Sequence, residues 1–309
     1  MSKLRHIIKK AFAPAVLKNK KIVGRKPLRQ KVDLDRPPCV LRLSDQGDLW
    51  EKFRPVWQDL WSDWFAGQRV LVKVNLNTPD PYPASTCPDF LKEFLQFLHS
   101  YGVDDILAGD CSSLSSLPTR KTARKVGLEQ AVAGLAELVF FDELDWVEVA
   151  VPGRFLKTVT VPEVVYEVDR IINLTNLKTH PWADFSMAMK NAVGYLHPLE
   201  RRELHQDHLR QKIVELNLAV MADLSIIDGR MAMITGGPAV GATASAGIVL
   251  IGDHPAAVDL QACQELFCIK ERYHCVENFC VNPLEMPQLK HAAMMWPAAE
   301  WQHYRLYKY

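Results

Sequence analysis

The chain has 309 residues, of which 48% are hydrophobic and 24% carry a charge. These proportions are typical of a globular protein, so they exclude a disordered chain, a collagen and a coiled coil. No apolar run reaches the ~18 residues that a membrane-spanning helix needs. The net charge of +1 hides an asymmetry, because residues 1–32 hold eleven of the 37 Lys and Arg residues and no Asp or Glu. The rest of the chain has 26 basic and 36 acidic residues, so a basic arm precedes an acidic body.

The basic N-terminal arm, residues 1–32, has interpretations that the sequence leaves open. Lys9 and Lys10 interrupt the apolar stretch that a secretory signal peptide would need. The composition resembles an organellar leader or a helix that lies on a membrane surface. Alternatively, the arm is a solvated segment that lies across the acidic body or across a neighbouring subunit of a homo-oligomer. We therefore expect residues 1–32 to make a peripheral membrane contact or a protein contact.

The cysteine content bears on the compartment. Seven cysteines at irregular spacing do not suggest a disulfide framework in a chain of this length. An odd count without a signal peptide favours the cytoplasm or another reducing compartment. The arm adds an organellar or peripheral membrane location as the alternative.

A tryptophan-rich helix is expected after an extended segment at residues 40–43. Its apolar side chains recur at steps of three and four residues, as on one helical face: Trp50, Phe53, Trp57, Leu60, Trp61 and Trp64. Pro55 lies within this stripe, so we expect the helix to begin near Pro55 or to bend there. Four tryptophans on one face are more typical of a core or a subunit interface than of a ligand cage.

From residue 70 onward, predicted strands alternate with predicted helices. The strands are expected at residues 70–76, 104–109, 138–141, 169–174, 224–228 and 248–252. Helices are expected to begin near Thr86, to span residues 118–136 and to begin near His254. Two runs around Pro152 and Gly153 predict a small antiparallel hairpin insertion. The order predicts an α/β fold with a largely parallel twisted sheet and helices on both faces.

Three parts of the chain are expected. Residues 1–32 form the basic arm and residues 33–283 form the α/β domain. Residues 284–309 form a helical and aromatic tail that packs on that domain.

Polar side chains follow several of the predicted strands. Lys73 and Asn75 end one strand, Asp110 and Ser112 follow the next, and Lys178 follows a third. Ligands of open parallel sheets bind outside the carboxyl ends of the strands. We therefore expect Lys73, Asn75, Asp110 and Ser112 to contact a ligand.

The segment from residue 173 to residue 208 carries the highest density of chemically active side chains. Lys178 and Lys190 are expected to hold a carboxylate or phosphate, because a lysine ammonium needs little geometric matching. Asn75 and Asn191 are expected to orient that anion by hydrogen bonds. His180 is the predicted proton carrier, with His205 as a second acid–base group. The alternative for His205 and His208 is a solvated helix, because the neighbouring residues Glu200 to Asp207 are highly polar.

Two groups of side chains are candidate metal ligands. His205 and His208 lie three residues apart, so a helix would present both rings on one face, and Asp228 could join them. A second group has four thiols within 18 residues: Cys263, Cys268, Cys275 and Cys280. Zinc and iron–sulfur sites use such numbers of thiolates, but these spacings match no common motif, so buried free cysteines are the alternative. A divalent metal ion or an iron–sulfur cluster is thus a candidate cofactor.

A glycine-rich loop, residues 235–241, follows the strand that ends near Asp228. Gly236 and Gly237 could present backbone N–H groups to an anion. The loop matches neither a Walker loop nor a dinucleotide fingerprint. Alternatively, the glycines allow positive φ angles in a tight connection.

Several motifs follow one another in a fixed order: Lys73-Val74-Asn75-Leu76, Gly109-Asp110-Cys111-Ser112, Lys178-Thr179-His180, Lys190-Asn191 with Gly194, the downstream His205, Asp228-Gly229 with Gly236-Gly237-Pro238, and Gly252-Asp253 with Asp259. In this combination they resemble the domain-of-unknown-function 362 family. Val74 stands where the family usually has Pro, and the chain lacks the ferredoxin-type Cys-x-x-Cys clusters that many members append. The resemblance covers about residues 68 to 268 and implies the fold and the site more than a reaction.

Together these features predict an enzyme that binds a small anionic metabolite and uses Lys/His acid–base chemistry of isomerase, lyase or hydrolase type. The alternative is an iron–sulfur or other cofactor-binding redox or accessory protein without turnover of its own. A nucleic-acid partner is not expected, because the body is acidic and the basic residues lack aromatic stacking partners.

Overall fold

A computed structural model of the chain describes residues 22–29, 31–276, 279–297 and 301–309. The first 21 residues of the basic arm lie outside the described residues, so the expected membrane or protein contact of that part stays a prediction. Within the described residues, no helix is both long and apolar enough to cross a membrane.

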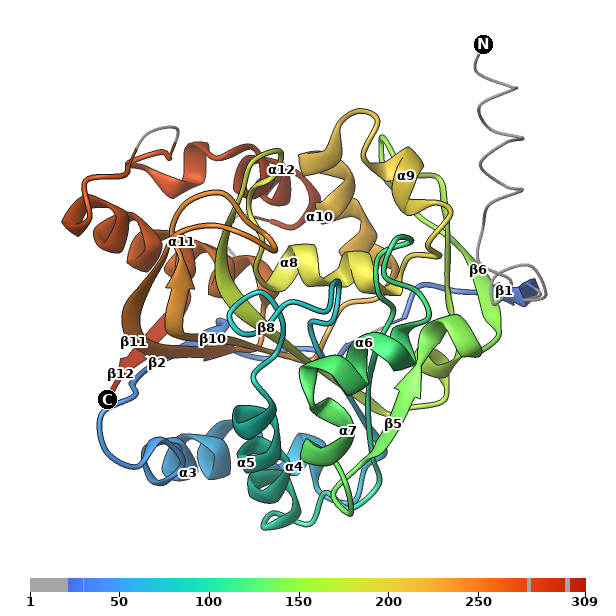
Figure 1. Cartoon of the computed structure of the whole chain (residues 1–309), viewed down its shortest axis with the longest axis horizontal. Helices are drawn as coiled ribbons and strands as arrows, with labels where there is room; N and C mark the ends of the chain where they lie inside the picture. Colours follow the sequence, from blue (N-terminus) through green and yellow to red (C-terminus); the bar gives the residue numbers. More distant parts are fainter. Residues whose placement is uncertain (1–21, 30, 277–278, 298–300) are drawn as a thin grey trace.

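The main sheet has the strand order β12-β2-β11-β10-β8-β3-β4-β5, and β9 pairs with β8 off this path (Figure 1). Its strands are β2 (Cys39–Ser44), β3 (Val70–Lys73), β4 (Ile106–Asp110), β5 (Glu137–Phe140), β8 (Arg170–His180), β9 (Asp184–Phe185), β10 (Leu224–Met233), β11 (Thr243–Gly252) and β12 (Arg305–Lys308). The run from β10 through β8, β3 and β4 to β5 is parallel. β11 is antiparallel to both β10 and β2. The predicted largely parallel sheet is confirmed, with an antiparallel hairpin where the glycine-rich loop joins β10 to β11.

Helices cover both faces of this sheet, as predicted (Figure 1). One face carries α3 (Leu49–Leu60), α4 (Ser62–Phe65) and α5 (Pro88–His99), and the other carries α8 (Ala188–Asn191), α10 (Leu209–Ala219), α11 (Pro255–Arg272) and α12 (Pro287–Met295). The remaining helices are α6 (Thr119–Val126), α7 (Leu128–Ala131) and α9 (Arg201–Leu204), with 3-10 turns η1 (Phe141–Glu143), η2 (Glu163–Tyr166), η3 (Ala192–Tyr195) and η4 (Pro283–Glu285). Each face has its own hydrophobic core, because the buried residues form two separate clusters.

A second, small sheet has the order β1-β6-β7, with β1 (Ile22–Lys26), β6 (Trp146–Ala150) and β7 (Thr158–Pro162). β6 and β7 are antiparallel, which confirms the predicted hairpin. β1 belongs to the basic arm and pairs with β6 in parallel. The described end of the arm therefore contributes a strand to the folded body.

Of the two expectations for Pro55, the one that the helix begins there is wrong, and the one that it bends there stays a prediction. α3 begins at Leu49, where the Asp48 side chain accepts hydrogen bonds from Trp50 N and Glu51 N, and it continues through Pro55. A proline within a helix costs about 3 kcal/mol, since a backbone hydrogen bond is lost. The buried aromatic face of α3 offsets this cost: Phe53 and Trp57 are fully buried and pack on each other.

Two further helix predictions differ from the structure in detail. The helix expected over residues 118–136 is interrupted at Gly127, whose φ of +91° ends α6. α5 begins at Pro88, close to the expected start near Thr86, but the Thr86 hydroxyl accepts a hydrogen bond from Asn75 N and does not cap the helix.

The C-terminal tail packs on the domain, and it adds an element that the sequence did not predict. β12 extends the main sheet by pairing in parallel with β2. Trp301 is fully buried and stacks on His254, with a ring-centroid distance of 6.2 Å. The tail is thus part of the sheet as well as a cover of the core.

Candidate functional site

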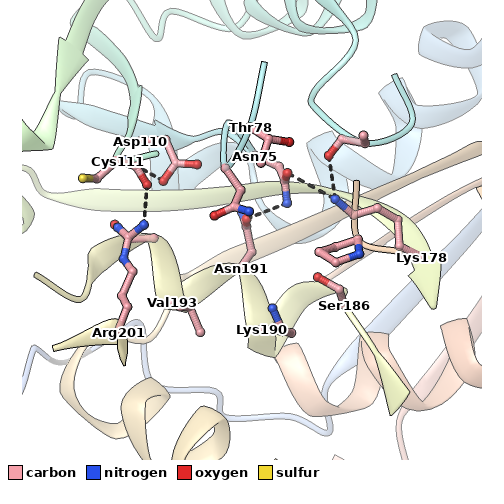
Figure 2. A pocket seen from close by; sticks show the side chains of 14 residues that line it. Asn75, Thr78, Asp110, Cys111, Lys178, Ser186, Lys190, Asn191, Val193 and Arg201 are labelled. Carbon is pink, nitrogen blue, oxygen red and sulfur yellow. Dashed lines mark hydrogen bonds between the residues drawn. The ribbon is translucent and has the colours of Figure 1, made fainter. Parts of the chain in front are cut away.

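A polar pocket lies where β3 and β4 end and where α8 and η3 face the sheet (Figure 2). β8 is longer than predicted, since it runs to His180, whereas its neighbour β3 ends at Lys73, opposite Asn173. The extra length carries Lys178 past the end of β3 and into the pocket. The lining residues are Asn75, Asn77, Thr78, Ala84, Asp110, Cys111, Lys178, Ser186, Lys190, Asn191, Val193, Gly194, Arg201 and Pro238.

Lys73 and Asp110 form a buried ion pair at the base of the pocket, with 2.8 Å between Nζ and Oδ1. Lys73 Nζ also donates to Val74 O, and the Asp110 carboxylate accepts from Leu76 N and Cys111 N, each at 2.7 Å. Burial lowers the pKa of Lys73, and the attraction of Asp110 opposes that shift. The two side chains therefore stabilise the strand ends. Their predicted contact with a ligand stays a prediction.

Ser112 is engaged in the same way. Its hydroxyl donates to Leu76 O at 2.6 Å, and its backbone N–H donates to Thr119 Oγ1. The side chain is fully buried. It ties the loop after β4 to the loop after β3.

A chain of amides connects the three segments that meet in the pocket. Asn191 Nδ2 donates to Asn173 Oδ1 at 2.6 Å, and Asn75 Nδ2 donates to Asn191 Oδ1 at 3.1 Å. Asn75 Oδ1 in turn accepts a hydrogen bond from Lys178 Nζ at 3.2 Å (Figure 2). Asn75 and Asn191 therefore position the Lys178 amine, and their polar groups bond one another.

Lys178 is almost fully buried, with 1% of its surface exposed. Its Nζ donates to Ala84 O at 2.7 Å and to Asn75 Oδ1, and both partners are uncharged. Burial, together with the nearby charge of Lys190, lowers its pKa to about 7.

Lys190 lies on α8 and lines the same pocket. Among the described residues it has no hydrogen-bond or ion-pair partner. Burial and the neighbouring charge of Arg201 lower its pKa to about 8.

The Asp259 carboxylate positions α8, because it accepts hydrogen bonds from Ala188 N at 2.7 Å and Met189 N at 2.9 Å. Burial raises the pKa of Asp259 to about 7.

Arg201 lines the pocket, although its polar neighbours predict a solvated helix; its burial corrects that prediction. It is 7% exposed, and its guanidinium donates to four carbonyl oxygens, those of Leu196, Cys111, Ser112 and Gly194, at 2.7 to 3.0 Å. These partners are uncharged, so no carboxylate of the described residues neutralises the positive charge of Arg201. The sequence signal that could have predicted the burial of Arg201 is its three-residue spacing from the apolar Leu204, since residues three apart share a helical face.

His180 lies at the end of β8, where its Nδ1 accepts hydrogen bonds from Trp182 N and Ala183 N, both at 3.1 Å. Nδ1 is then unprotonated, so Nε2 carries the proton of the neutral ring. Burial, followed by the charge of Lys190, lowers the pKa of His180 to about 2. In this environment the ring is suited to donate a hydrogen bond from Nε2, and it is poorly suited to carry protons near neutral pH.

His205 ends α9 and has the opposite arrangement. Its Nδ1 donates to Arg201 O at 2.5 Å, so Nε2, which has no hydrogen-bond partner in the part of the chain that the structure describes, can accept a proton. Burial lowers its pKa, and the bond to the Arg201 carbonyl opposes this shift. The exposed Trp182 contacts both His180 and His205 edge to face, with ring centroids 6.4 and 6.5 Å apart.

The pocket has a narrow inner part and a wider outer part. The inner part has a cavity volume of about 40 Å³, and the outer part has about 540 Å³. Both parts share the lining residues Asn77, Lys190, Val193, Arg201 and Pro238, and the outer part adds His180 and His205. Lys178 thus lines the inner part and the two histidines line the outer part.

The glycine-rich loop forms one edge of the pocket. Gly236 and Gly237 have φ angles of +63° and +84°, as glycine allows, and the Gly237–Pro238 peptide bond is cis. Gly237 N donates to Val240 O at 2.8 Å within the loop, so this N–H already has an acceptor. A side chain at Gly237 would collide with Thr179 O. The loop therefore needs glycine to approach β8 closely and to place Pro238 against the pocket.

The candidate metal ligands are not brought together. His205 ends α9, whereas His208 has a φ of +47° before α10 and stacks on Phe155, so the expected shared helical face is wrong. Asp228 is held by Arg230 and Tyr82. Cys263 is buried in α11, while Cys268 and Cys280 are exposed. Within the described ranges, no group of three or more His, Cys, Asp or Glu side chains could hold a metal ion.

Three comparisons place this chain among known proteins. A solved structure of the lactate racemase apoprotein from Thermoanaerobacterium thermosaccharolyticum is similar at a TM-score of 0.42 and 10% identity. The match covers 81% of this chain and 58% of the racemase, so this chain spans less than two thirds of that protein. The search of curated proteins found no match. The model of the domain of unknown function DUF362 matches residues 70–264, more than half of the chain and the segment that holds the pocket. The chain belongs to the DUF362 family.

Proposed function

We propose that this protein is an enzyme that binds a small carboxylate or phosphate in the pocket between β8 and α8. The observation that carries the proposal is the pair Lys190 and Arg201. Both line the pocket, and neither is paired with a carboxylate among the described residues. Removing a cation from water without a counter-ion is costly, so a bound anion would recover much of that cost.

The balance of charged side chains that line the pocket supports an anionic ligand. Asp110 is the carboxylate that lines the inner part, and it is already bound to Lys73. Lys190 and Arg201 therefore leave an excess of positive charge in a poorly solvated space, where electrostatic attraction is strong. Lys190 would contact the anion directly, and Arg201 would contribute a fixed positive charge.

The proposed acid–base chemistry lies at the boundary of the two parts of the pocket. His180 would donate a hydrogen bond from Nε2 to a ligand oxygen, since its Nδ1 is already bonded. The free Nε2 of His205 would accept or return a proton. An anchored anion beside a proton acceptor fits isomerase, lyase or hydrolase chemistry.

Anion binding is tested by isothermal titration calorimetry with inorganic phosphate and with acetate, at constant ionic strength. We expect both to bind the wild-type chain and Lys190→Gln to weaken binding by about tenfold or more, because charge-assisted hydrogen bonds contribute about 1.5–3 kcal/mol. Lys290→Gln is the matched control, since Lys290 is an exposed lysine that pairs with Glu285. Absence of binding to the wild-type chain, or equal losses in both variants, would contradict the proposal.

The acid–base part is tested by proton exchange in deuterium oxide with a panel of small carboxylic acids and phosphate esters. We expect solvent deuterium to enter at least one compound, as followed by proton NMR. His205→Ala should slow the exchange without weakening phosphate binding. Exchange that is unaffected by His205→Ala would remove His205 from the proposed chemistry.

A further inference from the structure

The hydrogen bonds of Lys178 match an uncharged amine. An ammonium group has three N–H donors, whereas a neutral amine has two N–H donors and a lone pair. Lys178 Nζ has two acceptors among the described residues, Asn75 Oδ1 and Ala84 O. Both N–H groups of a neutral amine are thus satisfied, and the remaining direction is left for the lone pair in a side chain that lines the pocket.

The charges around Lys178 favour the same state. The charged groups that act on it are Lys190 from α8, Lys73 from β3 and Asp110 from β4. Lys73 and Asp110 largely cancel each other because they form an ion pair. The remaining neighbour, Lys190, repels a second positive charge, and burial lowers the pKa of Lys178 to about 7. At neutral pH a large share of Lys178 is therefore uncharged, whereas the uncharged share of an ordinary lysine is on the order of 10⁻³ to 10⁻⁴.

We infer that Lys178 is a nucleophile that forms an imine with the carbonyl carbon of a small 2-oxo acid held in the pocket. The inference rests on the proposed anion site, because Lys190 would hold the carboxylate beside that carbonyl. A buried lysine next to a second cation is a known way to obtain a reactive amine. The inner cavity of about 40 Å³ has room for roughly three water molecules, which suits a short acid.

The step balances without an oxidant or a reductant. The Lys178 lone pair forms the N–C bond, and the carbonyl π electrons move to the oxygen, which takes a proton from the Lys190 ammonium. The amine nitrogen then returns one proton to Lys190. Loss of the oxygen, together with two hydrogens that derive from the amine, releases one water molecule and leaves a C=N bond to Lys178.

The test uses glyoxylate with sodium cyanoborohydride on the full chain at pH 7. Cyanoborohydride reduces the imine that glyoxylate forms with a lysine to a stable carboxymethyl-lysine, and peptide mass spectrometry identifies the modified residue. We expect Lys178 to be labelled at least about tenfold faster than exposed Lys290, since its uncharged share is far larger. The labelling rate of Lys178 should rise with pH and level off above about pH 7. In Lys178→Met, this adduct should disappear while Lys290 is labelled as before.

Inorganic phosphate separates this inference from the proposed function. If Lys178 is labelled no faster than Lys290 while phosphate binds normally, the inference of an imine at Lys178 is wrong and the proposed anion site is supported. If Lys178 is labelled rapidly but phosphate neither binds nor slows the labelling, the inference that Lys178 is a nucleophile is supported and the proposed anion site is wrong. Rapid labelling that phosphate slows supports both. The comparison of Lys178 with Lys290 is made within the wild-type chain, so it does not depend on the folding of a variant.

Discussion

Lys73 Nζ and Asp110 Oδ1 lie 2.8 Å apart at the ends of adjacent strands, and both side chains are buried. This pair keeps the base of the pocket neutral, so among the described residues the unpaired positive charge that lines the pocket lies on Lys190 and Arg201. It also fixes the loops that follow β3 and β4, because Asp110 accepts hydrogen bonds from Leu76 N and Cys111 N.

Removal of one partner should therefore destabilise the whole fold. We expect Lys73→Met to lower the free energy of unfolding by about 3–5 kcal/mol, since a buried carboxylate is left without its counter-ion. Urea denaturation followed by circular dichroism measures this change. Lys290→Met, at an exposed ion pair, should have no measurable effect. Equal stability of the two variants would show that the buried pair contributes little.

Gly194 is adjacent to this pair, and an added methyl group has no room. A Cβ at this position would collide with Asp110 Oδ1 and Lys73 Nζ. We expect Gly194→Ala to cost about 1–3 kcal/mol of stability, as overpacking does. Gly24→Ala is the control, because a Cβ there meets no atom within 4 Å. Thermal unfolding of both variants checks the prediction, and an unchanged midpoint for Gly194→Ala would contradict it.

Anion affinity should fall as the pH rises from about 6 to 9. The anion is proposed to contact Lys190 in its protonated form, and the pKa of Lys190 is lowered to about 8, so this charge is lost in that range. Sulfate is the suitable probe, because its own charge does not change there. Above this pKa, we expect the affinity to fall by up to about tenfold per pH unit, because one proton is lost. Lys190→Gln should lose the step near pH 8, and a pH-independent affinity in the wild-type chain would contradict the assignment.

The imidazole of His180 should not titrate between about pH 4 and 8. Its Nδ1 accepts two backbone hydrogen bonds, and burial lowers its pKa to about 2, so the neutral Nε2–H form persists. Nitrogen-15 NMR of the imidazoles, assigned with His180→Gln, measures the tautomer and the titration directly. A transition near the ordinary histidine pKa of about 6.5 would restore His180 as a proton carrier.

Asp259 should make stability depend on pH in the direction opposite to that of an ordinary salt-bridged carboxylate. Its pKa in the folded chain is raised from 3.8 to about 7, so the folded state binds the proton more tightly than the unfolded state. Its contribution is fully present below about pH 4 and is lost as the pH rises through about 7. We expect wild-type stability to fall relative to Asp259→Asn over this range. Urea denaturation at several pH values measures the difference, and parallel profiles would contradict the shift.

The sequence predicted the sheet and the covering helices well, because hydrophobic periodicity and strand–helix alternation are local signals. The alternation from residue 70 onward was sufficient for the parallel sheet. Boundaries failed where a tertiary contact replaced a local preference. The aromatic core stabilises α3 through Pro55, and Thr86 bonds Asn75 instead of capping α5. β12 was missed because it pairs with β2, a segment that lies far away in the sequence.

The sequence also identified the segments of the pocket, since polar residues at strand ends are visible in a linear pattern. It did not predict how those residues divide their hydrogen bonds. Asn75 and Asn191 bond each other, and His180 bonds the loop that follows it, and these pairings depend on contacts between distant segments. Arg201 was missed for the same reason: its burial follows from carbonyl groups as far away as Cys111.

The amide chain of Asn75, Asn173 and Asn191 determines when the pocket can form during folding and whether it can be transferred to another protein. Its members come from segments up to 116 residues apart, and Arg201 bonds Cys111 O, which is 90 residues away. Contacts of such separation form only after the entropy of closing long loops has been overcome, so they arise together with the sheet. No peptide excised from the lysine and histidine segment should reproduce the pocket. Grafting it onto another protein would require the strands β3, β4 and β8 in their native order.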